Sequence, residues 1–312
     1  MLSRTADHLF WMARYLERAE SLARMLDAQH RLSLLPRSPE AVLQGWHAIL
    51  VSLGLEACFR ERHGDLSPRA VFEYLAFDRD HPGSILRCLT AARDNARAVR
   101  GTLTQEIWET VNATYLESRT ITPELPETRR GDFLEWVKYR THVFRGVTSG
   151  TLLRDEAMYF TSIGTFIERA DNTTRLLEAR WRDPGGSGER LLAEPSEWAV
   201  LLRAMSAFET YRRVCRDAIT PRRVTEMLLM RNDMPQSVHR CLDQLQANLQ
   251  LVAHEHSGET LRQVGALHAQ FHFGLFEELS ANGITSFLDR FQGKLRDLGQ
   301  RISSDFLARS DS

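Results

Sequence analysis

Two groups of residues, each with one small residue followed by four charged ones, recur at the same helical spacing, and their acidic members suit the binding of a metal or a cation. One group contains Ala13, Glu17, Glu20, Arg24 and Asp27, and the other contains Gly164, Glu168, Asp171, Arg175 and Glu178. Steps of four, three, four and three residues keep each group on one helix face, beside an apolar stripe that predicts contact with the core. The acids of both groups are therefore expected at the border of the core.

The four central carboxylates allow more than one interpretation. If the two helices face each other, the carboxylates of Glu17, Glu20, Glu168 and Asp171 converge and could hold Mg²⁺ or Mn²⁺, because these ions prefer oxygen ligands. In an enzyme, Glu17 and Glu168 would bind the metal or act as general acid and base. The same acids would also attract a cationic group, such as the amine of a peptide or a polyamine. Iron is disfavoured, because no Glu-x-x-His motif occurs at these positions.

A purely structural interpretation stays open beside these. Glu20 and Arg24, like Asp171 and Arg175, are spaced i,i+4 in the favourable orientation, which is worth about 0.2–0.5 kcal/mol on an exposed helix. The stripes would then form a buried network of salt bridges between two halves of the molecule, or solvent-exposed pairs. In an enzyme, Arg24 and Arg175 would instead orient the carboxylates. Small residues one turn before each acid pair would let two helices, or a helix and a ligand, approach closely at that level.

The elements that position these groups recur along the chain. Residues 67–89 and 220–242 share 11 identities in 23 positions at an offset of 153, and residues 10–27 resemble 161–178 at an offset of 151. Apolar residues recur at threes and fours throughout, without period-two alternation. We therefore expect an all-α, internally duplicated helical bundle, with halves 1–150 and 151–312 of about six helices each related by a pseudo-two-fold axis. The first long helix of each half is expected at 5–33 and 151–182.

Composition excludes several classes of protein. The chain has 312 residues, 43% of them hydrophobic, and a formal net charge of −1, which argues against a nucleic-acid partner. The apolar stretch 42–59 contains Gln44, His47 and Glu56, so it predicts a buried helix rather than a membrane span. No basic segment followed by an apolar one opens the sequence, and we expect a cytoplasmic protein without a membrane partner.

Other polar residues offer weaker signals. His268 and His272 are spaced i,i+4, as in a zinc site, but lack the glutamate of a HExxH motif and lie among phenylalanines, so packed histidines are favoured. Asn112 lies on an aromatic helix face, where it either bonds to a neighbour or lines a ligand pocket. The four cysteines show no CxxC spacing, and Cys88 and Cys241 are expected as reduced core thiols. Turn residues at 183–188 predict a loop.

Four segments together resemble the bacterial alpha-E domain family, which consists of all-helical proteins. These segments are 2–20, 92–116, 161–180 and 197–213, and they include ERAE, ERAD and an Asn-x-x-Tyr helix. The resemblance implies Glu17, Glu20, Glu168 and Asp171 as motif positions. It also implies a genomic association with a circularly permuted ATP-grasp ligase and often a transglutaminase-like protein, in systems proposed to make or modify small peptides.

From these features we expect a component of a bacterial peptide-ligation or peptide-modification system that works with an ATP-grasp ligase. In one version its paired acidic site binds a metal or the cationic group of a peptide or amine. In the alternative version the protein is a non-catalytic scaffold, and the acid and arginine stripes form a structural salt-bridge network. The sequence leaves open whether the protein catalyses a reaction.

Overall fold

The computed structural model describes residues 1–181, 195–274 and 283–307. Every regular element in these ranges is a helix, which confirms the predicted all-α fold. The loop predicted at 183–188 lies outside the described residues.

The first 151 residues form seven α-helices and a short 3₁₀ helix. They are α1 (Ser3–Ser33), α2 (Pro39–Leu53), α3 (Glu56–His63), α4 (Pro68–Ala76), α5 (Ile85–Ala98), α6 (Gln105–Ser118), η1 (Glu127–Arg129) and α7 (Arg130–Thr151). The described residues that follow form seven more α-helices and a π-helix. They are α8 (Glu156–Trp181), α9 (Pro195–Ala204), α10 (Phe208–Cys215), α11 (Pro221–Met230), α12 (Val238–Leu251), α13 (Gly258–Ala269), the π-helix η2 (Gln270–Gly274) and α15 (Ile284–Phe306).

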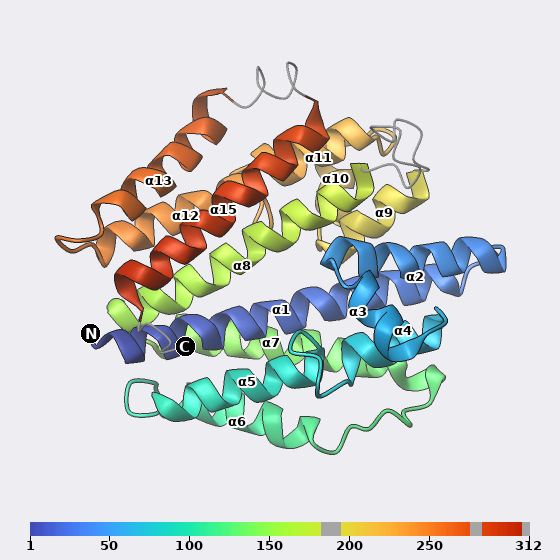
Figure 1. Cartoon of the computed structure of the whole chain (residues 1–312), viewed down its shortest axis with the longest axis horizontal. Coiled ribbons are helices and arrows are strands. Elements are labelled where there is room, and N and C mark those ends of the chain that lie inside the picture. The colour runs from blue at the N-terminus through green and yellow to red at the C-terminus, as the bar shows by residue number, and fades with distance from the viewer. Residues whose placement is uncertain (182–194, 275–282, 308–312) are drawn as a thin grey trace.

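The two long helices α1 and α8 lie side by side at the centre of the bundle (Figure 1). Helix α1 also packs against α5 and α7, whereas α8 also packs against α12 and α15. In Figure 1 the helices α5, α6 and α7 lie on one side of this central pair and α12, α13 and α15 on the other. The helices that contain the two acidic stripes are therefore the ones that join both sides of the molecule.

Capping residues explain where the outer helices begin. The hydroxyl oxygens of Ser38, Ser67 and Thr220 accept hydrogen bonds from backbone N–H groups of α2, α4 and α11, each of which has proline in its first turn. Ser84 and Ser237 cap α5 and α12 in the same way. Proline at this position loses no hydrogen bond, because the first N–H groups of a helix have no partner within it.

Three sequence predictions differ from the structure. The second motif helix begins at Glu156 rather than 151, because α7 continues to Thr151 and the chain turns before α8. Residues 42–59 form parts of two helices rather than one, since Gly54 adopts φ of 68° and ends α2. This extra break is one reason why the first half has seven α-helices instead of about six.

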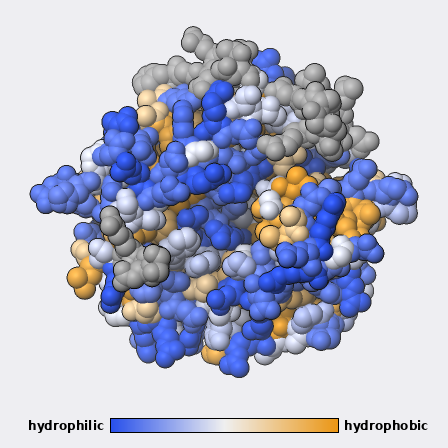
Figure 2. Space-filling model, viewed as in Figure 1, coloured by the Kyte–Doolittle hydropathy of each residue, from blue (hydrophilic) through white to orange (hydrophobic). Residues whose placement is uncertain are grey.

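Large apolar side chains fill the space between the helices, and the surface shown in Figure 2 is mostly hydrophilic with small apolar patches. Cys88 and Cys241 are buried free thiols, as predicted, whereas Cys58 is exposed. Burial raises the pKa of both Cys88 and Cys241 to about 12. None of the described helices has the length and apolar content that a membrane-spanning helix needs.

Candidate functional site

The Glu-Arg dipeptides of α1 and α8 pair with each other across the helix interface. Arg169 donates two hydrogen bonds to the carboxylate of Glu17, at 2.7 and 2.9 Å. Arg18 donates two hydrogen bonds to Glu168, at 2.6 and 3.0 Å. Adjacent residues on a helix point in different directions, so the glutamate and arginine of one dipeptide cannot pair with each other. Each dipeptide therefore supplies a partner for the other.

Arginine side chains hydrogen-bond to both carboxylate oxygens of each motif glutamate. Glu17 is 4% exposed and Glu168 is 2% exposed. Arg14 donates a further hydrogen bond to Glu168 at 2.7 Å, and Arg145 one to Glu17 at 3.2 Å. Bidentate pairs between guanidinium and carboxylate groups are among the stronger hydrogen-bonded contacts in proteins. These carboxylates are thus occupied within the fold.

Glu20 and Asp171 complete the acidic stripes with different degrees of burial. Glu20 is buried and accepts hydrogen bonds from Arg24 and Arg145. Burial opposes its ionisation, but contacts with His142, Arg145 and Arg24 outweigh burial and hold the pKa of Glu20 well below its usual range. Asp171 pairs with Arg175 at 2.8 Å and keeps about a quarter of its side chain exposed.

Positive charge exceeds negative charge around the motif acids. Six arginines contact the four carboxylates; they are Arg14, Arg18, Arg24, Arg145, Arg169 and Arg175. A divalent metal or an amine bound at these carboxylates would have to displace some of these guanidinium groups or lie beside them, which costs electrostatic energy. The geometry favours the salt-bridge interpretation over the metal and cationic-ligand interpretations.

The remaining stripe positions bind other elements. Asp27 pairs with Arg31 and with Lys138 of α7, both at 2.8 Å. Glu178 accepts a hydrogen bond from Gln292 of α15 at 2.6 Å. The stripes therefore connect the central helices to their outer neighbours as well as to each other.

Close approach of the central helices occurs where the sequence predicts it. A Cβ atom added to Gly164 would lie 2.3 Å from the backbone oxygen of Phe10, far inside contact distance. Ala13, the equivalent small residue of α1, is buried. A glycine in the middle of α8 costs helix stability, and the contact with Phe10 explains why it is present.

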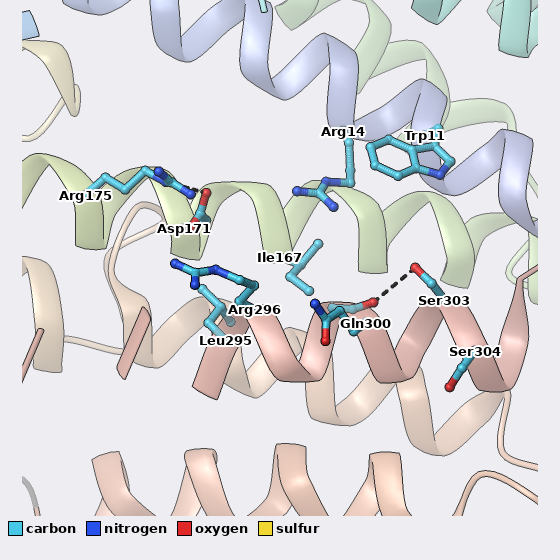
Figure 3. A pocket seen from close by; sticks show the side chains of 11 residues that line it. Trp11, Arg14, Ile167, Asp171, Arg175, Leu295, Arg296, Gln300, Ser303 and Ser304 are labelled. Carbon is cyan, nitrogen blue, oxygen red and sulfur yellow. Dashed lines mark hydrogen bonds and ion pairs between the residues drawn. The ribbon is translucent and has the colours of Figure 1, made fainter. Parts of the chain in front are cut away.

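A cavity of about 530 Å³ lies between α1, α8 and α15. Figure 3 shows Arg14 of α1 and Arg296 of α15 reaching toward α8 from opposite sides, near the pair formed by Asp171 and Arg175. Three of the lining residues are arginines and one is acidic, so the cavity favours an anionic group over a cation.

A second cavity, of about 300 Å³, lies directly behind the pair of Arg18 and Glu168. His81 and Asn172 line it, and in the described structure neither His81 Nε2 nor Asn172 Nδ2 makes a hydrogen bond, although both are buried. Burial lowers the pKa of His81, so its imidazole is neutral near pH 7. Buried polar groups without partners are uncommon, and they indicate a place for water or for a ligand.

The two acid pairs line different cavities. Glu168 and Asp171 line the cavity of His81, whereas Glu17 and Glu20 line another one, of about 250 Å³, beside α7. Asn112 lies elsewhere, on α6, where its side-chain oxygen is 3.4 Å from Arg93 Nε. The sequence did not identify Arg18 and Arg169 as the partners of the acids, although both recur within the repeated dipeptides.

Low pH should lower the free energy of unfolding, because it protonates Glu168. Burial alone would raise its pKa, but the guanidinium groups of Arg14 and Arg18 outweigh burial and lower the pKa to about 2. A glutamate in the unfolded chain titrates near about 4.3. The stabilisation is thus present above the unfolded pKa and is lost as pH falls toward 2, by about 3 kcal/mol in total. Urea unfolding between pH 7 and pH 2 measures most of this loss, and the Glu168→Gln variant should show a shallower pH dependence than the wild type; equal dependence would contradict the assignment.

Comparison with known proteins identifies a family that has the same dipeptide motif. Residues 1–307 match the model of the Alpha-E family, described as a predicted alpha-helical domain with a conserved ER motif. The chain is 25% identical over 334 aligned positions to uncharacterised proteins of Mycobacterium bovis and Mycobacterium tuberculosis. These alignments cover 98% of the chain and 37% of each relative, so the chain spans just over a third of their length. No solved structure matches it. With its facing Glu-Arg dipeptides and a match over nearly all of its length, the chain belongs to the Alpha-E family.

Proposed function

We propose that this protein is a non-catalytic binding component of a peptide-ligation or peptide-modification system, in which it acts with an ATP-grasp ligase. The observation behind the non-catalytic role is the reciprocal pairing of Glu17 with Arg169 and of Glu168 with Arg18. Carboxylates that are buried and held by guanidinium groups are poorly placed to take up a proton or a metal. The ER motifs would then lock the two central helices together.

The reciprocal pairing of the ER motifs is what a duplicated chain would produce, and we propose that duplication is the origin of the fold. Helices α5 and α6 begin 153 residues before α12 and α13, and α4 begins 153 residues before α11. Helix contacts also correspond: α1 packs on α5 and α7 as α8 packs on α12 and α15, and α6 packs on α7 as α13 packs on α15. In this proposal residues 1–150 and 151–312 are two copies of one unit, and the reciprocal pairs join them.

The cavity behind Arg18 and Glu168 is the binding site in this proposal. Its polar side offers His81 Nε2, Asn172 Nδ2 and the guanidinium group of Arg18, while leucines of α1, α2 and α4 and of the turn after α2 form its apolar side. A peptide segment matches such a lining, because it supplies a carbonyl or carboxylate oxygen, an N–H group and an apolar side chain at short spacing. At about 300 Å³ the cavity holds one or two residues.

A complex with the ligase tests the partner in this proposal. The full chain would be mixed with an ATP-grasp ligase encoded beside its gene, and the mixture examined by sedimentation and by ATP turnover with a peptide acceptor. We expect a complex and an altered turnover rate, and a transglutaminase-like protein can be tested in the same assay. In Glu17→Gln, any loss of the effect should follow the loss of folded protein measured by circular dichroism. A folded variant that binds the ligase without affecting turnover would instead support a catalytic glutamate, and the absence of any complex would remove the ligase from the proposal.

The cavity is tested by Asn172→Leu, which removes the amide that lacks a partner. Calorimetric titration with a panel of tripeptides that carry acidic, neutral or basic side chains should give binding to the wild type and at least about tenfold weaker binding to the variant, because one buried hydrogen bond is lost. Glu226→Gln, on the surface of α11, is the matched control and should bind as the wild type does. If the cavity holds only water, no tripeptide binds, and Asn172→Leu raises the melting temperature.

A further inference from the structure

Three histidines and one aspartate, all of them possible metal ligands, lie close together between α12, α13 and η2, far along the chain from the ER motifs. His239 and Asp243 are one turn apart on α12, and His268 and His272 are one turn apart where α13 passes into the π-helix η2. The sequence favours packed histidines for the second pair, because it lacks the glutamate of a HExxH motif and lies among phenylalanines. Asp243 and His268 are 25 positions apart, so no spacing argument connects the two pairs. The fold brings both pairs together.

Three of these residues place ligand atoms at one point. Asp243 Oδ1 lies 2.6 Å from His268 Nε2 and 3.6 Å from His239 Nε2. One ligand atom from each residue lies within 4.8 Å of the others. Ligand atoms of a tetrahedral zinc site are roughly 3.3 Å apart, given metal–ligand distances near 2.0 Å. The observed distances lie on either side of this spacing, so the three atoms would need only small shifts to reach it.

A hydrogen bond from its second ring nitrogen orients His239, as is usual for histidines that bind a metal. Its Nδ1 lies 3.0 Å from the backbone oxygen of Met230, to which it donates, so Nε2 is the ring nitrogen available to a metal. The residue is 8% exposed, and Nε2 makes no hydrogen bond within the described part of the chain. A buried Nε2 that faces a carboxylate oxygen requires a proton or a metal ion between the two atoms, and a metal ion would bind both.

We propose that His239 Nε2, Asp243 Oδ1 and His268 Nε2 bind a zinc ion. The ion would replace the short contact between Asp243 and His268, and the neutral imidazole of His268 would then carry its proton on Nδ1. The metal would neutralise Asp243 and supply the missing partner of His239. It would also join α12 to the end of α13, which meet through side-chain packing and the contact between Asp243 and His268.

His272 offers the fourth ligand position. Its ring centroid lies 5.9 Å from that of His239 and 5.9 Å from that of His268. It belongs to the π-helix, and such local widenings of a helix often occur at functional sites. His272 is exposed, whereas His239 is buried, so the metal could enter from the His272 side.

The ligand types select the metal. Imidazole nitrogen with one carboxylate suits zinc, whereas Mg²⁺ prefers oxygen ligands and keeps several waters. The helices that begin 153 residues earlier carry Leu86, Thr90 and Tyr115 at the corresponding positions. These side chains do not bind zinc. The proposed site therefore belongs to the second half alone and is separate from the ER pairs.

The test is calorimetric titration of Zn²⁺ into the full chain, purified without a histidine tag and treated with chelator. We expect one zinc per chain and a melting temperature raised by several degrees at a hundredfold excess over the dissociation constant. Asp243→Asn and His268→Gln, checked for folding by circular dichroism, should each weaken binding by at least about 100-fold. His256→Gln, whose side chain is 80% exposed, is the matched control and should leave binding unchanged.

Co²⁺ gives an independent readout on the unaltered protein, because a tetrahedral site with nitrogen ligands absorbs strongly in the visible range. We expect such a band, and Zn²⁺ should displace it while Mg²⁺ should not. A wild type that binds no Zn²⁺ overturns the proposal. So does zinc binding that Asp243→Asn and His268→Gln leave intact.

Discussion

Replacing Glu168 with glutamine should lower the free energy of unfolding by about 3–5 kcal/mol, because it leaves the partly buried Arg18 and Arg14 without their counter-charge. The carboxylate is 2% exposed and accepts three hydrogen bonds from these two arginines. Glutamine keeps the shape but accepts with one oxygen only and carries no charge. Urea unfolding followed by circular dichroism measures the change.

The matched control is Glu226→Gln on α11. Glu226 pairs with Arg222 at 2.9 Å, but the pair is open to solvent, with 37% of the Glu226 side chain and 74% of the Arg222 side chain exposed. Exposed pairs are worth about 0–1 kcal/mol, so this variant should unfold close to the wild type. Equal, small losses in Glu168→Gln and Glu226→Gln would mean that the motif pairs contribute little to the fold.

Alanine at Gly164 should destabilise the protein by about 3 kcal/mol, at the upper end of the range for overpacked cores. The new methyl group would lie 2.3 Å from the backbone oxygen of Phe10, and backbone cannot rotate away as a side chain can. The helices α1 and α8 would have to separate, which also lengthens the hydrogen bonds between the ER dipeptides. Thermal unfolding measures the loss.

Gly146→Ala separates this clash from the intrinsic effect of alanine in a helix. Gly146 is exposed on α7, and a Cβ atom added there meets nothing within 4 Å. Alanine is the better helix former, so this variant should gain up to about 1 kcal/mol. If Gly164→Ala also gains stability, the central helices do not approach as closely as described.

Local sequence signals were sufficient for much of the fold. The capping residues Ser67 and Thr220, each followed by proline, predict the starts of α4 and α11, and the steps of three and four residues predict which faces of α1 and α8 meet. Gly164 allows the close approach itself, of a helix or of a ligand. These features depend on neighbours within one or two helical turns, which is the range over which a sequence can be interpreted directly.

The partners of the acids could not be predicted in the same way. Spacing suggests Glu20 with Arg24, which the structure contains, but Glu17 with Arg169 depends on how two helices 150 residues apart align. The acidic stripes were expected to attract cations, and this expectation overlooked the arginines that α7 and the opposite motif contribute. The grouping of His239 with His268 has the same origin, because it exists only after α12 and α13 pack.

The central claim is that the ER dipeptides stabilise the fold by pairing across the helix interface, and a double-mutant cycle on Glu17 and Arg169 tests it most directly. Unfolding free energies would be measured for the wild type, Glu17→Gln, Arg169→Met and the double variant, with Arg222 and Glu226 as the surface cycle. We predict that each single variant loses about 3–5 kcal/mol, while the double variant loses much less than their sum. Additive losses, or a fully stable Glu17→Gln variant, would contradict the claim and return the carboxylates to a role in binding or catalysis.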